Sequence, residues 1–418
     1  ASPSAPQRNV SRRFTGGEGD VRDVEPSYDV KLLLFAMRAP EIPGLDPADQ
    51  PTWNIWEYDI NADTLRRIIT SDITAEAGQD VAPHYLPDGR IIFSSSRQRL
   101  SRAILLDEGK PQFAAVEEDR REHSMVLHVM NPDGSDIKQV SFNQSHDMDP
   151  TVLSSGEVVF SRWDNMGSRD AISLYKMNPD GTGLSLLYGA HSHDTGTNGT
   201  TVQFLQPREL PGGRLLSVIL PYTGTYGGGE LISLDIDNYI DKTQATADNF
   251  GVLSGPAQES LLVNDVRTDG GISPGGRFRS AWPLQDGSDR LLVSWSECRL
   301  FEDPLIVPCT TERLAAPAAV PADPLYGIFL YNLSSDTQLP VVVPEEGFTF
   351  SEVVATAPRP LPGIIFDRQV GIELDQQWVD ENVGVLNIRS VYDVDGMDTS
   401  VTGIAALADP AQTVAADR

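Results

Sequence analysis

The sequence predicts an all-β protein, a six-bladed β-propeller whose blades are four-stranded and antiparallel. A proline-containing motif recurs six times at intervals of 57 to 76 residues, and each copy leads through a turn into an apolar strand. Apolar residues at helical spacing are not sustained anywhere in the chain. A strand-rich unit that repeats with this period is typical of propellers. The copies are centred on Pro26, Pro83, Pro150, Pro207, Pro283 and Pro358.

The second repeat illustrates the predicted order of elements within one blade. Pro87-Asp88-Gly89 forms a turn, because proline presets φ and glycine accepts a positive φ, and a strand follows at 90–95. A further strand at 125–130 ends in Asn131-Pro132-Asp133-Gly134 and is followed by a strand at 137–140. Two strand pairs of this kind make one four-stranded blade.

The predicted domain organisation is a single propeller with two short flanks. Residues 1–20 form an N-terminal extension, residues 21–400 the propeller, and residues 401–418 a tail without turn or strand signals. Whether the protein continues beyond that tail stays open. We expect either the segment before Glu25 or a strand at 383–388 to close the ring by pairing with the other end, because closure removes exposed strand edges.

The composition is strongly acidic. The chain has 32 Lys and Arg against 60 Asp and Glu, a net charge of −28 and a pI near 4.4. Such a charge argues against nucleic acid as a partner, because the phosphates would be repelled. It indicates either solubility in a salty exterior or an acidic face for a basic partner or cations, and its even spread favours the first. No apolar run reaches the length of a transmembrane segment.

Two features predict an exported protein, periplasmic or extracellular. The chain begins Ala1-Ser2-Pro3-Ser4 without Met, as a mature protein does after removal of its signal peptide, and without the Cys of a lipid anchor. Cys298 and Cys309 bracket one short loop, and in an oxidising compartment they are expected to form a disulfide. Such a bridge contributes about 3 kcal/mol.

The repeats also resemble a known family. The stretches 80–93 and 177–182 look like the repeats of TolB-type propellers. The stretch 141–164 is similar to the middle, propeller domain of the hydrazine synthase alpha subunit and its bacterial relatives, and the likeness covers roughly residues 20 to 400.

That resemblance implies neighbouring domains with c-type haems and a c-type cytochrome as a protein partner. This chain departs from the family at the haem. It has no Cys-x-x-Cys-His motif, and its two cysteines are too far apart to form one. Haem attachment therefore does not transfer to these residues, and we expect no covalent cofactor.

Two apparent catalytic motifs are predicted to be structural. Gly271-Ile272-Ser273-Pro274-Gly275 matches a nucleophile elbow, but Pro274 has no N–H to donate to an oxyanion, so a turn is expected. Tyr222–Gly229 has four glycines without the Lys-Ser/Thr of a phosphate loop, which indicates a flexible hairpin loop.

Carboxylates suggest a calcium site at one position. Asp235, Asp237 and Asp241 have the alternate spacing of calcium ligands, and calcium requires six to eight oxygen ligands. No glycine marks the sharp turn of a calcium loop, and no glutamate closes it. An acidic turn between strands is the favoured alternative.

Histidines suggest a second metal site. His146 and His193 occupy the same tripeptide, Ser-His-Asp, and His191 directly precedes the second copy, which ends at Asp194. Both segments connect successive blades, so they are expected near one mouth of the central channel. Neutral imidazoles there would bind a transition metal or contact a haem. In the alternative, each His-Asp pair caps a turn and hydrogen-bonds neighbouring blades.

Two classes of function follow. The first is a non-catalytic propeller, a protein-interaction scaffold in an extracytoplasmic assembly with c-type cytochromes. The second is a redox enzyme domain whose active site needs a haem-bearing partner or a further region. The sequence has no complete catalytic constellation, which favours the scaffold.

Overall fold

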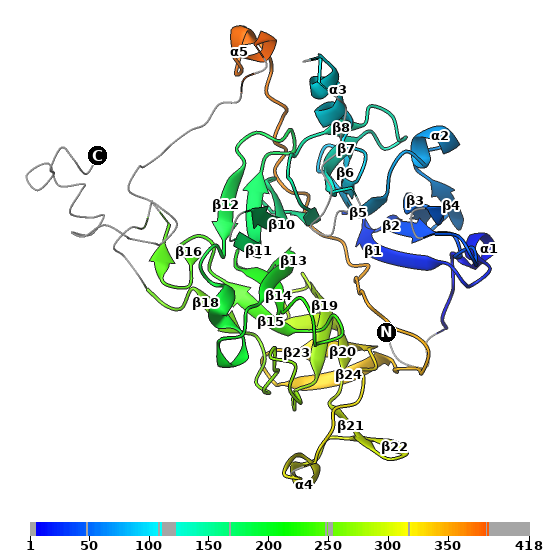
Figure 1. The fold of residues 1–418 in the computed structure, drawn as a ribbon, viewed down its shortest axis with the longest axis vertical. Helices are drawn as coiled ribbons and strands as arrows, with labels where there is room; N and C mark the ends of the chain where they lie inside the picture. The colour runs from blue at the N-terminus through cyan, green and yellow to red at the C-terminus, as the bar shows by residue number, and fades with distance from the viewer. Residues whose placement is uncertain are drawn as a thin grey trace, which may run out of the picture.

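The structure, a computed structural model, describes residues 6–46, 49–107, 109–110, 123–166, 169–246, 249, 254–316, 318–381 and 383. Within these residues, five four-stranded antiparallel sheets follow one another around a common centre (Figure 1). Each sheet is a meander in chain order, with a small hairpin inserted in the fourth and the fifth. The predicted all-β propeller with four-stranded blades is confirmed.

The strands have the following bounds. Blade 1 contains β1 (Asp20–Pro26), β2 (Leu32–Arg38), β3 (Asn54–Asp59) and β4 (Thr64–Arg67). Blade 2 contains β5 (Asp80–Tyr85), β6 (Ile91–Ser95), β7 (Val126–Met130) and β8 (Lys138–Gln139). Blade 3 contains β9 (Asp147–Val152), β10 (Val158–Met166), β11 (Arg169–Met177) and β12 (Ser185–Tyr188). Blade 4 contains β13 (Gln203–Glu209), β14 (Leu215–Leu220), β15 (Glu230–Leu234) and β18 (Gln258–Ser260), and blade 5 contains β19 (Arg277–Pro283), β20 (Arg290–Ser296), β23 (Gly327–Asn332) and β24 (Thr337–Val342).

The remaining elements are short. The inserted hairpins are β16 (Tyr239–Asp241) with β17 (Gln244–Ala245), and β21 (Arg299–Glu302) with β22 (Leu305–Pro308). The helices are α1 (Arg12–Thr15), α2 (Asp72–Ala75), α3 (Arg99–Asp107), α4 (Thr311–Leu314) and α5 (Gln376–Asp380). No helix in the described ranges is both long and apolar enough to cross a membrane.

A β-bulge interrupts the innermost strand of each blade. The pairing of β1, β5, β9, β13 and β19 with the next strand shifts register once, across the repeat proline in blades 2, 3 and 4 and shortly before it in blades 1 and 5. In blades 2 to 4 the bulge accommodates the proline, which has no N–H for the ladder, and in every blade it redirects the local side chains. In four blades the bulge contains a non-glycine residue with a positive φ: Asp23 (58°), Ala82 (49°), Asp149 (50°) and Gln206 (50°).

Apolar clusters hold neighbouring blades together. Leu34 and Ile55 of blade 1 are buried with Ile91 and Phe93 of blade 2, and equivalent clusters join blades 2 and 3, 3 and 4, and 4 and 5. Each cluster removes the inner faces of two sheets from water, which is the main source of stability for stacked sheets.

The predicted sixth blade is wrong. The sixth repeat is extended, and the described residues 343–369 contain no strand. Pro358, Pro360 and Pro362 alternate along it, so successive N–H groups on one side of the segment are missing and a ladder cannot form there. The predicted closure is also wrong for the segment before Glu25, which belongs to β1 and pairs with β2. Residues 384–388 lie outside the described residues.

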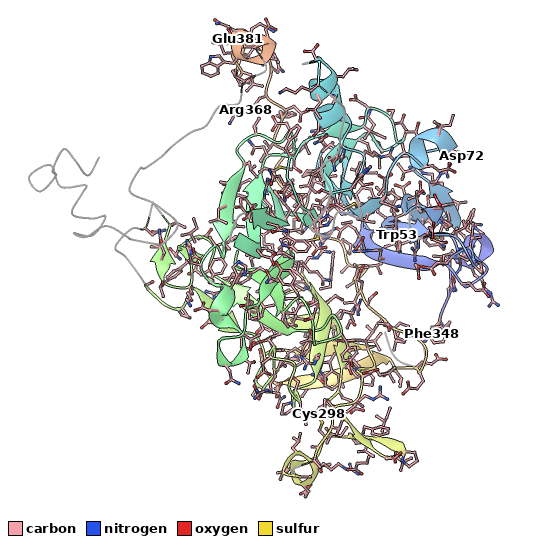
Figure 2. All side chains as sticks on the ribbon, viewed as in Figure 1. Trp53, Asp72, Cys298, Phe348, Arg368 and Glu381 are labelled. Carbon is pink, nitrogen blue, oxygen red and sulfur yellow. A yellow bond between two sulfur atoms is a disulfide. The ribbon has the colours of Figure 1, made fainter. Side chains whose placement is uncertain are left out.

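The sixth repeat instead forms a strap, residues 350–368, that runs through the middle of the molecule (Figure 1). It begins on blade 5, where Ser294 Oγ donates to the carbonyl of Phe350. It reaches blade 3, where Gly363 N–H donates to the Ser154 carbonyl over 3.0 Å. The strap leaves the blades near Arg368, far from Phe348 and Cys298 (Figure 2).

A glycine permits the close approach of strap and blade 3. Gly156 has a φ of 93°, and a Cβ at this position would lie 2.1 Å from the carbonyl oxygen of Gly363. Any side chain here would therefore push the strap away, in addition to straining the turn.

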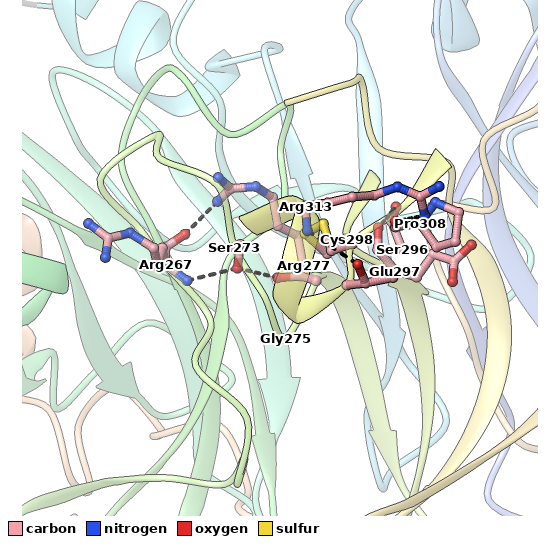
Figure 3. Close-up of a disulfide and its surroundings, with 12 residues drawn as sticks. Arg267, Ser273, Gly275, Arg277, Ser296, Glu297, Cys298, Pro308 and Arg313 are labelled. Carbon is pink, nitrogen blue, oxygen red and sulfur yellow. Dashed lines mark hydrogen bonds between the residues drawn. A yellow bond between two sulfur atoms is a disulfide. The ribbon is translucent and has the colours of Figure 1, made fainter. Parts of the chain in front are cut away.

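The predicted disulfide is confirmed. Cys298 and Cys309 are bonded at the base of the β21–β22 hairpin, with their Cα atoms 5.4 Å apart. Figure 3 shows the bridge and its surroundings, and Figure 1 shows the hairpin projecting away from the blades.

Candidate functional site at the centre of the propeller

The centre of the propeller contains a charged network built from the repeat itself. Its members lie next to the repeat prolines, and in blades 1 to 4 each directly follows the bulge of the innermost strand. They come from all five blades and the strap: Glu25, His84, Thr151, Arg208, Trp282 and Arg359.

Glu25 is the hub of this network. Its carboxylate accepts a hydrogen bond from Arg359 of the strap over 2.5 Å and lies 3.6 Å from the Arg208 guanidinium. His84 Nε2 lies 3.2 Å from Glu25 Oε1. The Glu25 side chain is buried, and its Oε2 has no hydrogen-bond donor among the residues that the structure describes.

Burial and neighbouring charges shift the pKa values of Glu25 and His84 in opposite directions. Burial acts to raise the pKa of Glu25, but His84, Arg359 and Arg208 together lower it, so the group is a carboxylate at neutral pH. Burial lowers the pKa of His84 to about 4, against the effect of Glu25. The ring is therefore uncharged at pH 7, and its single proton points either to Glu25 or to the Tyr85 carbonyl, 3.0 Å from Nδ1.

Aromatic rings complete the network. The Arg208 and Arg359 guanidinium carbons lie 5.1 and 4.9 Å from the centre of the Trp282 ring, and Arg359 also lies 4.9 Å from the Tyr28 ring. Cation–π contacts of this kind stabilise a cation that is partly removed from water. Arg359 N–H also donates to the Tyr28 carbonyl over 3.0 Å, which fixes the strap against blade 1.

A second, acidic layer adjoins this network. Asp23, Asp149 and Glu352 line a cavity of about 50 Å³ together with Glu25 and His84. A cavity of that size accommodates a few water molecules.

Glu352 joins the strap to blade 1 within the acidic layer. Its carboxylate accepts hydrogen bonds from the backbone N–H groups of Asp23 and, over 3.3 Å, Val24. Burial and the neighbouring Asp23 raise the pKa of Glu352 to about 7.

We expect Glu352→Gln to stabilise the protein at pH 8 by about 2 to 3 kcal/mol. A pKa raised by folding means that ionisation costs stability, and this cost grows as the pH rises from about 4.5 through about 7. Glutamine avoids the charge and can still accept from Asp23. The advantage should shrink to about half at pH 5.5, as measured by urea denaturation at both pH values.

Glu41→Gln is the matched control, because that side chain is exposed and its replacement should have no comparable effect. A Glu352→Gln advantage that does not change between pH 8 and 5.5 would contradict the assignment of the raised pKa.

The histidines predicted from sequence have structural partners. His146 Nδ1 accepts from Met125 N–H over 3.0 Å, and His193 contacts the Val202 carbonyl at 2.6 Å and Ser173 Oγ at 3.2 Å. His191 is held through its backbone N–H by Asp241. Among the described residues, no group of three or more His, Cys, Asp or Glu side chains is placed to hold a metal ion. The metal at His146, His191, His193 and Asp194 stays a prediction, and the contacts favour the turn-bonding alternative.

The acidic segment at 235–241 has similar contacts. Asp235 accepts from Asn238 N–H over 3.2 Å, as a turn cap does, and Asp241 accepts from Ser192 Oγ over 2.6 Å. The second bond ties the β16–β17 insertion to the loop after blade 3. Calcium at Asp235, Asp237 and Asp241 therefore also stays a prediction.

The two motifs interpreted as structural have structural contacts. Ser273 Oγ donates to the Gly276 carbonyl over 2.6 Å and accepts from Arg267 N–H, so the predicted turn is confirmed. The glycine-rich segment connects β14 and β15, and Gly229 exchanges two backbone hydrogen bonds with Phe278 of blade 5. The predicted hairpin connection is present, and at Gly229 it is fixed to blade 5.

Sequence reasoning missed the central network, although its signal was in the repeat. The network residue beside each repeat proline is polar or aromatic, where a buried strand normally carries an aliphatic residue. Aligning the six motifs on their prolines places His84, Thr151, Arg208 and Arg359 at one position directly after the proline, with Glu25 on the other side of Pro26.

Comparison with known proteins supports the fold. No protein-family model and no curated protein matches the chain. Among solved structures, hydrazine synthase of Kuenenia stuttgartiensis superposes with a TM-score of 0.51 and 19% identity, over 78% of this chain and 39% of that one. The chain therefore shares its propeller fold with hydrazine synthase. It spans well under half the length of that protein.

Two TolB structures are also among the matches. TolB of Acinetobacter baumannii matches with a TM-score of 0.37 and 12% identity, over 66% of this chain and 51% of that one. A TolB from Agrobacterium tumefaciens matches with a TM-score of 0.27 and 18% identity, over 38% and 46% of the two chains.

Proposed function

We propose that this protein is a non-catalytic, extracytoplasmic β-propeller that acts as a protein-interaction scaffold through its projecting hairpin. The observation that carries the proposal is an apolar surface on β21–β22. Phe301 and Ile306 are cross-strand partners, so they share one face, and they are 46% and 47% exposed. Leu305 at the turn is 63% exposed, and Val320, beside Phe301, is 51% exposed.

The hairpin is held in shape without the help of a partner. The disulfide closes its base, and the segment at 320–322 bonds alongside β21 through Phe301 N–H and the Arg299 carbonyl. Arg313 of α4 pairs with Glu302 over 2.9 Å. Because little order remains to be gained on binding, such a surface supports affinity through preorganisation.

Charge indicates what kind of partner fits. At a net charge of −28, two copies of this chain repel each other, which disfavours self-association through the hairpin. A basic protein with an apolar pocket is attracted instead. The resemblance to hydrazine synthase suggests a c-type cytochrome, and the disulfide suits the periplasm or cell exterior.

The test uses the variant Phe301→Asp with Ile306→Asp. We expect wild type to bind an immobilised basic c-type cytochrome from the same compartment, more weakly as salt rises. The double variant should bind roughly 30-fold more weakly, the effect of losing about 2 kcal/mol at a buried anchor. Ile73→Asp is the control, because Ile73 is 87% exposed on α2 and lies outside the hairpin.

Two outcomes would contradict the scaffold. One is binding that the double variant leaves unchanged. The other is a concentration-dependent dimer in light scattering that the double variant abolishes, since the hairpin would then join two copies of this chain. The redox alternative predicts a haem-dependent activity of the complex that neither protein has alone.

A further inference from the structure

A buried arginine near the base of the hairpin forms no ion pair among the described residues, and Asp269, a carboxylate that acts on it from farther away, is paired with Arg267. Arg277 is only 9% exposed, yet no carboxylate within the described part of the chain lies within ion-pair distance of it. Its guanidinium donates to the carbonyls of Arg267 over 2.5 Å and Gly271 over 2.8 Å. These two bonds orient the group but bring no negative charge.

Arg97 shows the usual arrangement in this same molecule. Its guanidinium is fully buried and meets the carboxylate of Asp80, also fully buried. A buried cation without such a partner is expensive, because it has lost water and gained no opposite charge. In a chain with 60 acidic and 32 basic residues, the absence of a carboxylate beside Arg277 is the more unexpected.

The surroundings of Arg277 offer space and further donors. Arg277 lines a cavity of about 70 Å³ together with Arg299, Gly271 and Cys298. An arginine has five N–H donors, and two of those of Arg277 bond to the carbonyls above. The one carboxylate that lines the cavity, Glu297, is exposed, and Arg299 pairs with Glu346 outside it.

A buried hydroxyl nearby is also unsatisfied. Tyr326 is 2% exposed, and its hydroxyl has no hydrogen-bond partner in the described part of the structure. The hydroxyl and Arg277 approach the same backbone position, since a Cβ on Gly228 would lie 2.1 Å from the Tyr326 oxygen and 2.9 Å from Arg277 Cβ. The region therefore holds a buried cation without an ion pair and a buried hydroxyl without a hydrogen bond among the described residues.

We propose that the cavity beside Arg277 binds a small oxyanion, which neutralises the buried guanidinium. Charge-assisted bonds from guanidinium to carboxylate or phosphate oxygens are among the strongest in proteins. The volume suits a single carboxylate or an inorganic tetrahedral anion. This site goes beyond the proposed scaffold function, because it requires no partner protein.

The experiment measures thermal unfolding of the whole chain in sodium phosphate, sulfate or acetate, against chloride at equal ionic strength. We expect one oxyanion to raise the midpoint with a dependence on its concentration that saturates as a single site. Isothermal calorimetry with that anion should give a stoichiometry of one. A response to phosphate or sulfate assigns a free inorganic anion, and a response to acetate assigns a carboxylate, which an acidic side chain of a bound protein would also supply.

Arg277→Gln should weaken that anion roughly tenfold or more, the loss of one charge-assisted bond. Arg13→Gln is the control, because it removes the same positive charge as Arg277→Gln. Arg13 is exposed on α1, which is far from Arg277 in the sequence. If Arg277→Gln does not fold, Arg277→Lys takes its place, because it keeps the charge and should still bind the anion. Isothermal calorimetry on the wild-type protein tests the anion site in either case. Equal midpoints in all four salts, or a response that Arg277→Gln retains, would overturn the site.

Discussion

Replacing Arg97 by leucine is expected to destabilise the protein by about 3 to 5 kcal/mol. Both side chains of the Arg97–Asp80 pair are 0% exposed, and Arg97 Nε donates to Asp80 Oδ1 over 2.9 Å. The guanidinium also donates to the carbonyls of Thr74 and Ala75 at the end of α2. Its removal would leave a buried carboxylate without the charge that compensates it, although Ser95 Oγ, 2.7 Å away, still donates to it.

Urea denaturation measures this effect directly. The control is Lys138→Leu, which breaks an exposed pair with Asp136 and should cost less than about 1 kcal/mol. Adding Asp80→Asn to Arg97→Leu should recover part of the loss, because the uncompensated charge is then gone. The assignment fails if Arg97→Leu costs no more than Lys138→Leu.

The five complete blades could be predicted from sequence because their signals are local. Turns such as Pro87-Asp88-Gly89 depend on the φ preferences of single residues, and the strands beside them are short apolar runs. The disulfide was predictable for a similar reason, since Cys298 and Cys309 bracket one short hairpin.

The fate of the sixth repeat depends on partners that local patterns do not contain. Pro358 marks a sixth repeat in the sequence, but its alternation with Pro360 and Pro362 prevents a ladder. The strap is held by residues far away in sequence: Arg90 pairs with Asp367 over 2.7 Å, and Asp180 accepts from Arg368 N–H over 2.9 Å. No periodicity in the sequence encodes those contacts.

The histidine prediction failed to find the central network for a related reason. His146 and His193 share a tripeptide, and this shared pattern predicts a site in the connections between blades. His84 is the buried histidine beside Glu25, but its sequence context is an ordinary strand. The bulge that brings it to Glu25 needs a positive φ at Ala82, a residue type that does not signal one.

The central network leads to the second large effect. Glu25→Gln should destabilise the protein by about 3 to 5 kcal/mol, because Arg359 and Arg208 would lose the carboxylate that compensates them both. The loss of stability should be concentrated in the strap, because Arg359 holds the strap through Glu25 and the Pro26 carbonyl. Hydrogen exchange of peptides covering 350–368 is therefore expected to accelerate more than exchange in the blades.

Asp29→Asn is the matched control for Glu25→Gln. Asp29 follows β1 closely and pairs with Lys31, but both side chains are more than half exposed, so its effect on stability should be small. Arg359→Gln combined with Glu25→Gln completes a double-mutant cycle, and a coupling of at least 1 kcal/mol is expected for groups in direct contact. If strap and blades instead accelerate equally in exchange, Glu25 supports the whole ring and does not selectively anchor the strap.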